Sequence, residues 1–173
     1  VEKIFPTPIV FSHIDREFTD TERELFRTIA SDRTQNMGNT RSRSSSVLDR
    51  EEMSDIRMFI QSKLDWYVAN ILVTPKEDNV SLRITQSWMN FTNPGQHHHK
   101  HVHNNSFVSG VFYINAIEEL DRILFYDKKF DSMIQPNQAE FNEFNSPARF
   151  FPVSTGKLVL FPSWLPHSVP GTD

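Results

Sequence analysis

The sequence predicts a mainly β fold, a barrel or a sandwich, backed by two helices in the N-terminal half of the chain. Two segments before residue 75 carry apolar residues at helical spacing, and from residue 82 the spacing changes to the alternation of a strand. Several short apolar stretches follow, separated by Pro, Asn, Asp and Gly. Two helices followed by many short strands are typical of a barrel or sandwich that is covered by helices.

Residues 4–14 are apolar, but Pro6 and Pro8 interrupt them. Proline cannot donate a hydrogen bond to a sheet, so this segment fits an edge strand better than a central one. Residues 35–46 are rich in Asn, Gly, Arg and Ser, which predicts a solvated loop. The first helix is expected between these two segments.

Both helices have clear end signals in the sequence. Thr19 and Glu22 form a T-x-x-E capping box, and apolar residues at helical spacing continue to about Ser31. The second helix is expected over residues 49–73, where apolar residues recur every three or four positions. Pro75 marks its end, because proline is common shortly after the last turn of a helix. We expect both helices to lie outside the sheets.

Strands are expected throughout the second half of the chain. Over residues 82–91 the residue types alternate with period two, which places Gln86, Trp88 and Asn90 on one face of a strand. Further stretches of strand type are bounded by turn residues. They cover residues 107–115, 122–127, 148–153 and 157–161.

The composition is that of a globular protein without cysteine chemistry. The chain has 173 residues, which fits a single domain over 1–173, and 38% of them are hydrophobic. Cysteine is absent, so any metal must be bound by nitrogen or oxygen ligands. A net charge of −4 and the lack of a long apolar run disfavour nucleic acid and membrane partners. We expect a cytoplasmic protein.

Five of the seven histidines lie in the short tract from His97 to His103. Alternate residues of a strand point to the same side, so His101 and His103 can present two imidazoles to one metal ion. His99 and His101 have the same spacing, and periodicity alone does not distinguish the two pairs. The residues from His97 to His99 also fit a polar loop or a supporting role beside the ligands.

A third ligand must come from elsewhere in the chain, and His167 is the best candidate. It follows an apolar stretch that begins after Gly156, and Pro162 and Pro166 fix the path of the backbone before it. The alternative is a buried histidine that hydrogen bonds to its neighbours. An H-x-H pair after a turn, together with a distal histidine at the end of a strand, favours the metal site.

Two strand faces near the histidines carry further candidates. Asn90 shares a face with Gln86 and Trp88 and precedes the turn that leads to the histidines, so it can enter the same cavity. Tyr113 shares a face with Ser109 on the next strand, which can direct its hydroxyl into that cavity. A hydrogen-bonded Asn at a strand end and a core tyrosine explain these spacings equally well.

Three segments together resemble the 2-oxoglutarate- and Fe(II)-dependent oxygenases of the prolyl-hydroxylase-like group. They are SWMNFTNPGQHHHKHVHNNSFVSGVFYIN, RILFYD and GKLVLFPSWLPHSV, within residues 87–169. The H-x-H followed by S-G-V-F-Y and the distal F-P-S-W-L-x-H are specific in combination. The N-terminal half is similar to the family only in its opening I-F-P-T-P.

The resemblance implies a double-stranded β-helix, or jelly roll, with Fe(II) at its mouth and 2-oxoglutarate as co-substrate. His101 and His167 match the two histidine ligands of the family, and His103 stands where the wider superfamily has Asp or Glu. Tyr113 matches a tyrosine that contacts the distal carboxylate of 2-oxoglutarate. A basic residue and the last strand of the domain are expected beyond Asp173.

The remaining site candidates come from the strand faces and the histidine tract described above. We expect Trp88 and Asn90 to line the co-substrate site together with Tyr113. We expect His99, Gln86 and Ser109 to contact the metal ligands without binding the metal themselves. No catalytic residue is expected beyond the metal ligands, because iron and 2-oxoglutarate carry the oxidative chemistry in this family.

The resemblance implies a hydroxylase-type dioxygenase that releases succinate and CO2 and oxidises a small-molecule or peptide substrate. A cupin that does not use 2-oxoglutarate is the nearest alternative, because the spacings from Gly95 to His103 and from Gly156 to His167 fit most of the two cupin motifs. Trp164 stands where the second motif has glycine, and no glutamate follows His103. A noncatalytic jelly-roll binding module is the other alternative.

Overall fold

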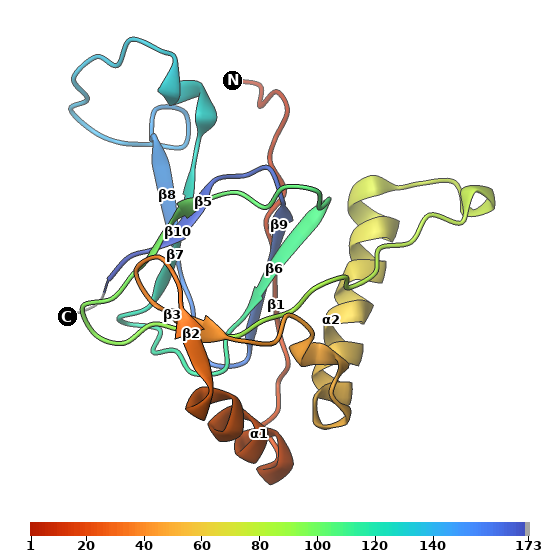
Figure 1. Cartoon of the computed structure of the whole chain (residues 1–173). Helices are drawn as coiled ribbons and strands as arrows, with labels where there is room; N and C mark the ends of the chain where they lie inside the picture. The colour runs from red at the N-terminus through yellow and green to blue at the C-terminus, as the bar shows by residue number, and fades with distance from the viewer. Residues whose placement is uncertain (172–173) are drawn as a thin grey trace. The chain divides into compact units, whose positions relative to one another are not determined.

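The computed structural model describes residues 1–171 of the chain. The chain forms two units, one built from Val1–Phe11 and the residues from Thr92 onward, the other from Ser12–Phe91. The histidine tract and most of the strands belong to the first unit, and both α-helices belong to the second (Figure 1). All three predicted metal ligands therefore lie within one unit.

Helix α1 spans Asp20–Ser31 and begins at the predicted capping box. The Thr19 hydroxyl accepts a hydrogen bond from the Glu22 backbone N–H at 3.2 Å, and the Glu22 carboxylate accepts one from the Thr19 N–H at 2.7 Å. The Arg16 guanidinium lies 2.6 Å from this buried carboxylate and lowers the pKa of Glu22. The two reciprocal bonds satisfy backbone N–H donors at the start of the helix that have no carbonyl partner within it.

The second predicted helix is confirmed, although only its middle is α-helical. Helix α2 spans Ser54–Tyr67. The 3-10 turns η1 (Val47–Asp49) and η2 (Glu51–Met53) precede it, and the π-helical turn η3 (Val68–Leu72) follows it. Its buried residues, three or four positions apart, are Ile56, Ile60, Leu64 and Tyr67. Among residues 1–171, no helix combines the length and apolar character that crossing a membrane requires.

The predicted loop over residues 35–46 is partly wrong, because a small sheet forms there. Strand β2 (Arg33–Gln35) pairs with β3 (Thr40–Ser42), and β3 pairs with β4 (Asn90–Phe91). The strand expected over residues 82–91 is correspondingly short. Only two residues of β3 pair with β4 in a ladder. The stretch before β4 makes separate contacts instead: the Ser42 backbone N–H donates to the Met89 carbonyl at 2.9 Å, and Ser87 forms an isolated parallel bridge with Ser46.

In the first unit, strands β1 (Val10–His13), β9 (Lys157–Pro162) and β6 (Val108–Phe112) form a sheet in that order. Strand β1 lies at the edge, as Pro6 and Pro8 just before it predict. Strands β6 and β9 are antiparallel, and Gly110 lies opposite Leu160. A Cβ atom at Gly110 would lie 2.7 Å from the Leu160 side chain, so the glycine of the S-G-V-F-Y motif permits this close packing.

The other sheet of this unit carries the histidines. Its order is β5 (His98–His101), β10 (His167–Val169), β7 (Arg122–Tyr126) and β8 (Ala148–Pro152), and all its pairs are antiparallel (Figure 1). The strands predicted over residues 107–115, 122–127, 148–153 and 157–161 are thus confirmed as β6, β7, β8 and β9. Two short 3-10 turns complete the described elements: η4 (Lys76–Asp78) and η5 (Lys128–Asp131).

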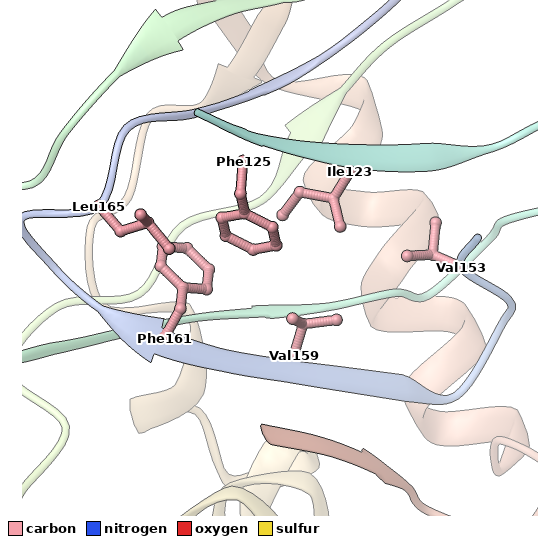
Figure 2. Close-up of a cluster of buried hydrophobic side chains, with 6 residues drawn as sticks. All are labelled: Ile123, Phe125, Val153, Val159, Phe161 and Leu165. Carbon is pink, nitrogen blue, oxygen red and sulfur yellow. The ribbon is translucent and has the colours of Figure 1, made fainter. Parts of the chain in front are cut away.

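Apolar side chains from both sheets meet in a buried cluster. Figure 2 shows Ile123 and Phe125 of β7 directed toward Val159 and Phe161 of β9, with the side chains from the neighbouring turns beside them. The complete cluster is Ile123, Phe125, Val153, Val159, Phe161 and Leu165. Burial of these side chains fixes the face that each strand presents to the interior. The mainly β prediction with antiparallel sheets and two helices is confirmed, and the double-stranded β-helix stays a prediction.

Candidate metal centre

Strand pairing brings His101 and His167 together across 66 positions of sequence (167 − 101). Strand β10 runs antiparallel to β5, and His167 lies directly opposite His101. The centroids of their imidazole rings are 4.3 Å apart. The distal histidine that the sequence singled out therefore lies beside the tract in space.

His103 completes a group of three, although it lies outside the strand. Strand β5 ends at His101, so the expectation that His101 and His103 occupy one regular strand is wrong. The His103 backbone N–H instead donates to the Ser163 carbonyl at 3.0 Å. Its ring lies 5.0 Å from that of His101 and 5.1 Å from that of His167, centroid to centroid. The turn after β9 thus positions His103 beside His101 and His167.

Ser109, which the sequence predicts as a supporting residue, contacts this same turn. Its hydroxyl lies 2.8 Å from the hydroxyl of Ser163, and Ser163 is fully buried. The Ser163 backbone N–H also donates to the Phe107 carbonyl at 3.1 Å. Ser163 therefore links strand β6 to the backbone of His103, which fixes the place from which that imidazole extends.

The hydrogen bonds of two imidazoles assign their tautomers. The Nδ1 atom of His101 lies 2.7 Å from the His99 carbonyl, and the Nδ1 atom of His167 lies 3.1 Å from the Leu165 carbonyl. A carbonyl oxygen only accepts, so each Nδ1 carries the proton and donates. The lone pair then resides on Nε2, which is the arrangement that metal-binding histidines adopt when a backbone carbonyl orients them.

Burial keeps these imidazoles neutral. It lowers the pKa of His167 to about 3, and it also lowers the pKa values of His101 and His103. The charged form of a buried imidazole loses its hydration, and each neighbouring imidazole adds repulsion once it is protonated. At neutral pH all three side chains therefore hold the unprotonated nitrogen that a metal requires.

The three side chains form a donor set that a single ion can join. One nitrogen from each of His101, His103 and His167 lies within 4.8 Å of the others. Two nitrogens bound to one ion at about 2.1 Å are at most about 4.2 Å apart, so small side-chain rotations close the triad. Imidazole nitrogen suits iron, zinc, copper and nickel better than the hard ions that prefer oxygen. We call this group the inner triad.

A β-bulge brings His98 to the same side of β5 as His101, which the sequence did not predict. His101 pairs with His167, but His98, three positions away, pairs with Val169, two positions away. The extra residue in β5 shifts the phase of its side chains, as bulges do next to functional sites. Strict alternation would place His98 and His101 on opposite faces. A tract of adjacent histidines carries no signal for the position of the bulge.

Tyr113 follows β6 and packs against the buried cluster that includes Phe125 and Phe161. Its hydroxyl is buried and has no hydrogen-bond partner among residues 1–171. Burial raises the pKa of Tyr113, and the nearby charge of Asp121 raises it further. The hydroxyl is therefore a buried, protonated donor. An unpaired buried donor is costly, so a polar group that reached this hydroxyl from outside the described residues would be stabilised there.

The remaining candidates lie in the unit formed by residues 12–91. Asn90 is exposed in β4, where it pairs with Arg41. Gln86 is exposed and Trp88 is half-buried, whereas Met89 between Trp88 and Asn90 is buried. The three residues that the alternation assigned to the site thus lie on the more solvent-exposed face of this segment. The role of Gln86, Trp88 and Asn90 beside the co-substrate stays a prediction.

A family model described as "Putative 2OG-Fe(II) oxygenase" matches residues 86–173, which is 88 of the 173 residues. The matched region includes the complete inner triad. Comparison with curated proteins finds no match. The family implies Fe(II) and 2-oxoglutarate as cofactors, and iron is among the metals that an imidazole donor set accepts. The chain therefore belongs to the family of 2-oxoglutarate- and Fe(II)-dependent oxygenases.

Proposed function

We propose that this oxygenase is a hydroxylase that oxidises a C–H bond of a small-molecule or peptide substrate, on a double-stranded β-helix whose iron ligands are His101, His103 and His167. The convergence of these three imidazoles carries the proposal, because two of them already donate through Nδ1 and leave Nε2 available. When bound, iron and 2-oxoglutarate supply the oxidation, in which 2-oxoglutarate and O2 yield succinate, CO2 and one oxygen atom for the substrate.

The charge of the ligand set favours an anionic co-substrate. The described histidine group contains three neutral imidazoles and no carboxylate, so it leaves the full double charge of a divalent ion uncompensated. A 2-oxoglutarate dianion would neutralise that charge. Electrostatic attraction in a partly buried site is stronger than in water, so the all-histidine set supports tight binding of 2-oxoglutarate.

The chain also limits the access of water to the inner triad. His167 is only 3% exposed, and the ring of Phe161 lies 4.5 Å from its imidazole, centroid to centroid. The centroid of the Phe125 ring lies 6.2 Å from the centroid of the same imidazole. These apolar groups keep water from one side of the ligand, which protects reactive species from side reactions and strengthens the electrostatic interactions of the site.

Tyr113 is the proposed partner of the distal carboxylate of 2-oxoglutarate. Its hydroxyl donor is buried and finds no partner in the part of the chain that the structure describes, and Tyr113 packs on the apolar cluster that also contacts His167. A carboxylate that enters this interior would satisfy the orphaned donor with a charge-assisted hydrogen bond. The family resemblance assigns the same contact to this tyrosine.

The direct test of the proposal is anaerobic titration of the iron-loaded protein with 2-oxoglutarate. We expect a visible charge-transfer band of the iron chelate, and on admission of O2 we expect slow formation of succinate even without substrate. A protein that holds stoichiometric iron but gives neither band nor succinate would support the cupin alternative. A protein whose metal excludes every added chelator would support the noncatalytic binding module.

Replacing Tyr113 with phenylalanine is expected to change stability and affinity in opposite directions. Loss of the unpaired hydroxyl should leave the ligand-free protein equally or more stable, because a buried unsatisfied polar group costs about 1–3 kcal/mol. Loss of the bond to a carboxylate should weaken 2-oxoglutarate binding about 10- to 100-fold. Thermal unfolding and equilibrium titration measure the two effects.

Tyr126→Phe provides the matched control for this prediction. The Tyr126 hydroxyl lies 2.9 Å from the Ser168 hydroxyl, so its removal leaves a buried group without its partner and should lower the melting temperature. A Tyr113→Phe protein that is less stable than the wild type, with unchanged 2-oxoglutarate affinity, would contradict the proposed role of Tyr113.

A further inference from the structure

His101 belongs to a second group of histidines as well as to the inner triad. One nitrogen from each of His98, His99 and His101 lies within 4.8 Å of the others. The ring of His98 lies 4.4 Å from that of His101, and the ring of His99 lies 5.0 Å from it, centroid to centroid. The rings of His98 and His99 lie 5.3 Å apart, so the outer separations are close to those of the inner triad, which range from 4.3 to 5.1 Å. We call this group the outer triad.

The outer triad is assembled by the bulge in β5. Residues 98, 99 and 101 fall within four consecutive positions, which a regular strand would divide between its two faces. The two-against-three register opposite β10 allows His98 to stack on His101. All three side chains of the group are half-buried, so an ion can reach them from solvent.

His101 has one lone pair available for metal binding, and the inner and outer triads share it. Its Nδ1 atom donates to the His99 carbonyl, which leaves Nε2 as its metal-binding atom. One Nε2 lone pair binds one ion, so an ion held by the outer triad takes His101 away from the inner triad. Occupation of the two triads is therefore mutually exclusive, even though the two groups contain five histidines.

We infer that His98, His99 and His101 form a second site for a divalent transition-metal ion such as Zn²⁺, Co²⁺, Ni²⁺ or Cu²⁺, and that this site competes with the inner triad for His101. Three imidazole nitrogens without oxygen ligands favour these borderline ions, and Ni²⁺ and Cu²⁺ bind such sites more tightly than Fe²⁺ does. An ion in the outer triad acts as an antagonist of iron. This inference rests on the proposed role of the inner triad as the iron site. The outer triad can be tested separately.

The experiment counts Co²⁺ bound to chelator-treated protein under anaerobic conditions, by equilibrium dialysis and by the visible spectrum of the bound ion. The wild-type chain should bind one ion, because the triads share His101. His167→Gln removes an inner ligand and should still bind one ion, now at the outer triad. Adding His98→Gln to His167→Gln should weaken that remaining binding at least about tenfold, since it removes one of three ligands.

His97→Gln is the matched control, because His97 lies in the same tract but is exposed and belongs to neither triad. Combined with His167→Gln, it should leave Co²⁺ binding unchanged. Circular dichroism and thermal unfolding confirm that each variant is folded. A His167→Gln protein that binds no more Co²⁺ than the double variant with His98→Gln overturns the outer site, and two ions on the wild type overturn the shared ligand.

A failure of the proposed function gives a different result. His98→Gln alone leaves the inner triad complete and should bind one ion. If it binds none while His167→Gln binds one, the outer site stands and the inner triad is not the iron site.

Discussion

Iron binding at the inner triad and succinate formation should both be lost when His167 is replaced by alanine. His167 is the only ligand candidate that β10 contributes to the inner triad, and its side chain is buried opposite His101. Loss of groups that merely orient a ligand lowers metal affinity about 10- to 100-fold, so loss of the ligand itself should lower it by at least about 100-fold. Iron analysis after dialysis and a succinate assay measure the two losses.

The control for His167 is its neighbour on the same strand. Ser168 is also buried, and its hydroxyl lies 2.9 Å from that of Tyr126. Ser168→Ala removes a buried hydrogen bond without removing a nitrogen ligand, so it should lower stability by about 1 kcal/mol and leave the iron content intact. If Ser168→Ala loses iron as completely as His167→Ala does, the loss reflects damage to β10 rather than removal of a ligand.

The second large effect is expected at His103, where alanine and aspartate should give opposite results. His103→Ala leaves two ligands and should lose most of the iron. His103→Asp provides a carboxylate at the position where the wider superfamily has one, so it should retain iron. Its negative charge reduces the net charge at the metal, so we expect weaker binding of 2-oxoglutarate than in the wild type.

The His99→Ala variant distinguishes between the two possible ligand pairs, His99 with His101 and His101 with His103, which the alternation of a strand leaves open. The His99 side chain belongs to the outer triad, and its contribution to His101 is a backbone carbonyl that alanine retains. We therefore expect the His99→Ala protein to keep its iron. Iron analysis of purified His99→Ala, His103→Ala and His103→Asp decides which pair binds the metal. A His103→Ala protein that keeps iron, beside a His99→Ala protein that loses it, would assign the iron to the outer triad.

Local signals in the sequence predicted the elements whose partners are local or whose pattern is strong. The capping box at Thr19 and Glu22 specified the first turn of α1, because both bonds form within four residues. Strand β7 was predicted because residues 122–127 are a short stretch of strand type bounded by turn residues, and in the structure Ile123 and Phe125 alternate with less buried residues. The hairpin of β2 and β3 was missed, because its strands have only three residues each and little apolar character to distinguish them from a loop.

The sequence predicted which histidines form the candidate site but not how their side chains are arranged. The sequence singled out His101, His103 and His167. Pairing of β5 with β10 brings His101 and His167 together, and the bond from the His103 N–H to the Ser163 carbonyl places His103 beside them. The tautomers of His101 and His167 depend on the directions of two backbone carbonyl groups. The position of His98 depends on a bulge, and a bulge reflects the pairing of two strands rather than the residues of one.

If His101 and His167 hold the iron, as proposed, the distance between them in sequence links the supply of iron to the lifetime of the protein. An ion held by both residues fastens together two points 66 positions apart, so it opposes the large gain of chain entropy on unfolding. At a free ion concentration of about 100 times Kd, a ligand that binds only the folded chain adds about 2.7 kcal/mol to the free energy of unfolding, and binding of the ion to the unfolded histidine tract reduces this gain. In a cell short of iron, more of the chain would be open to proteases, and the abundance of the enzyme would fall along with its activity.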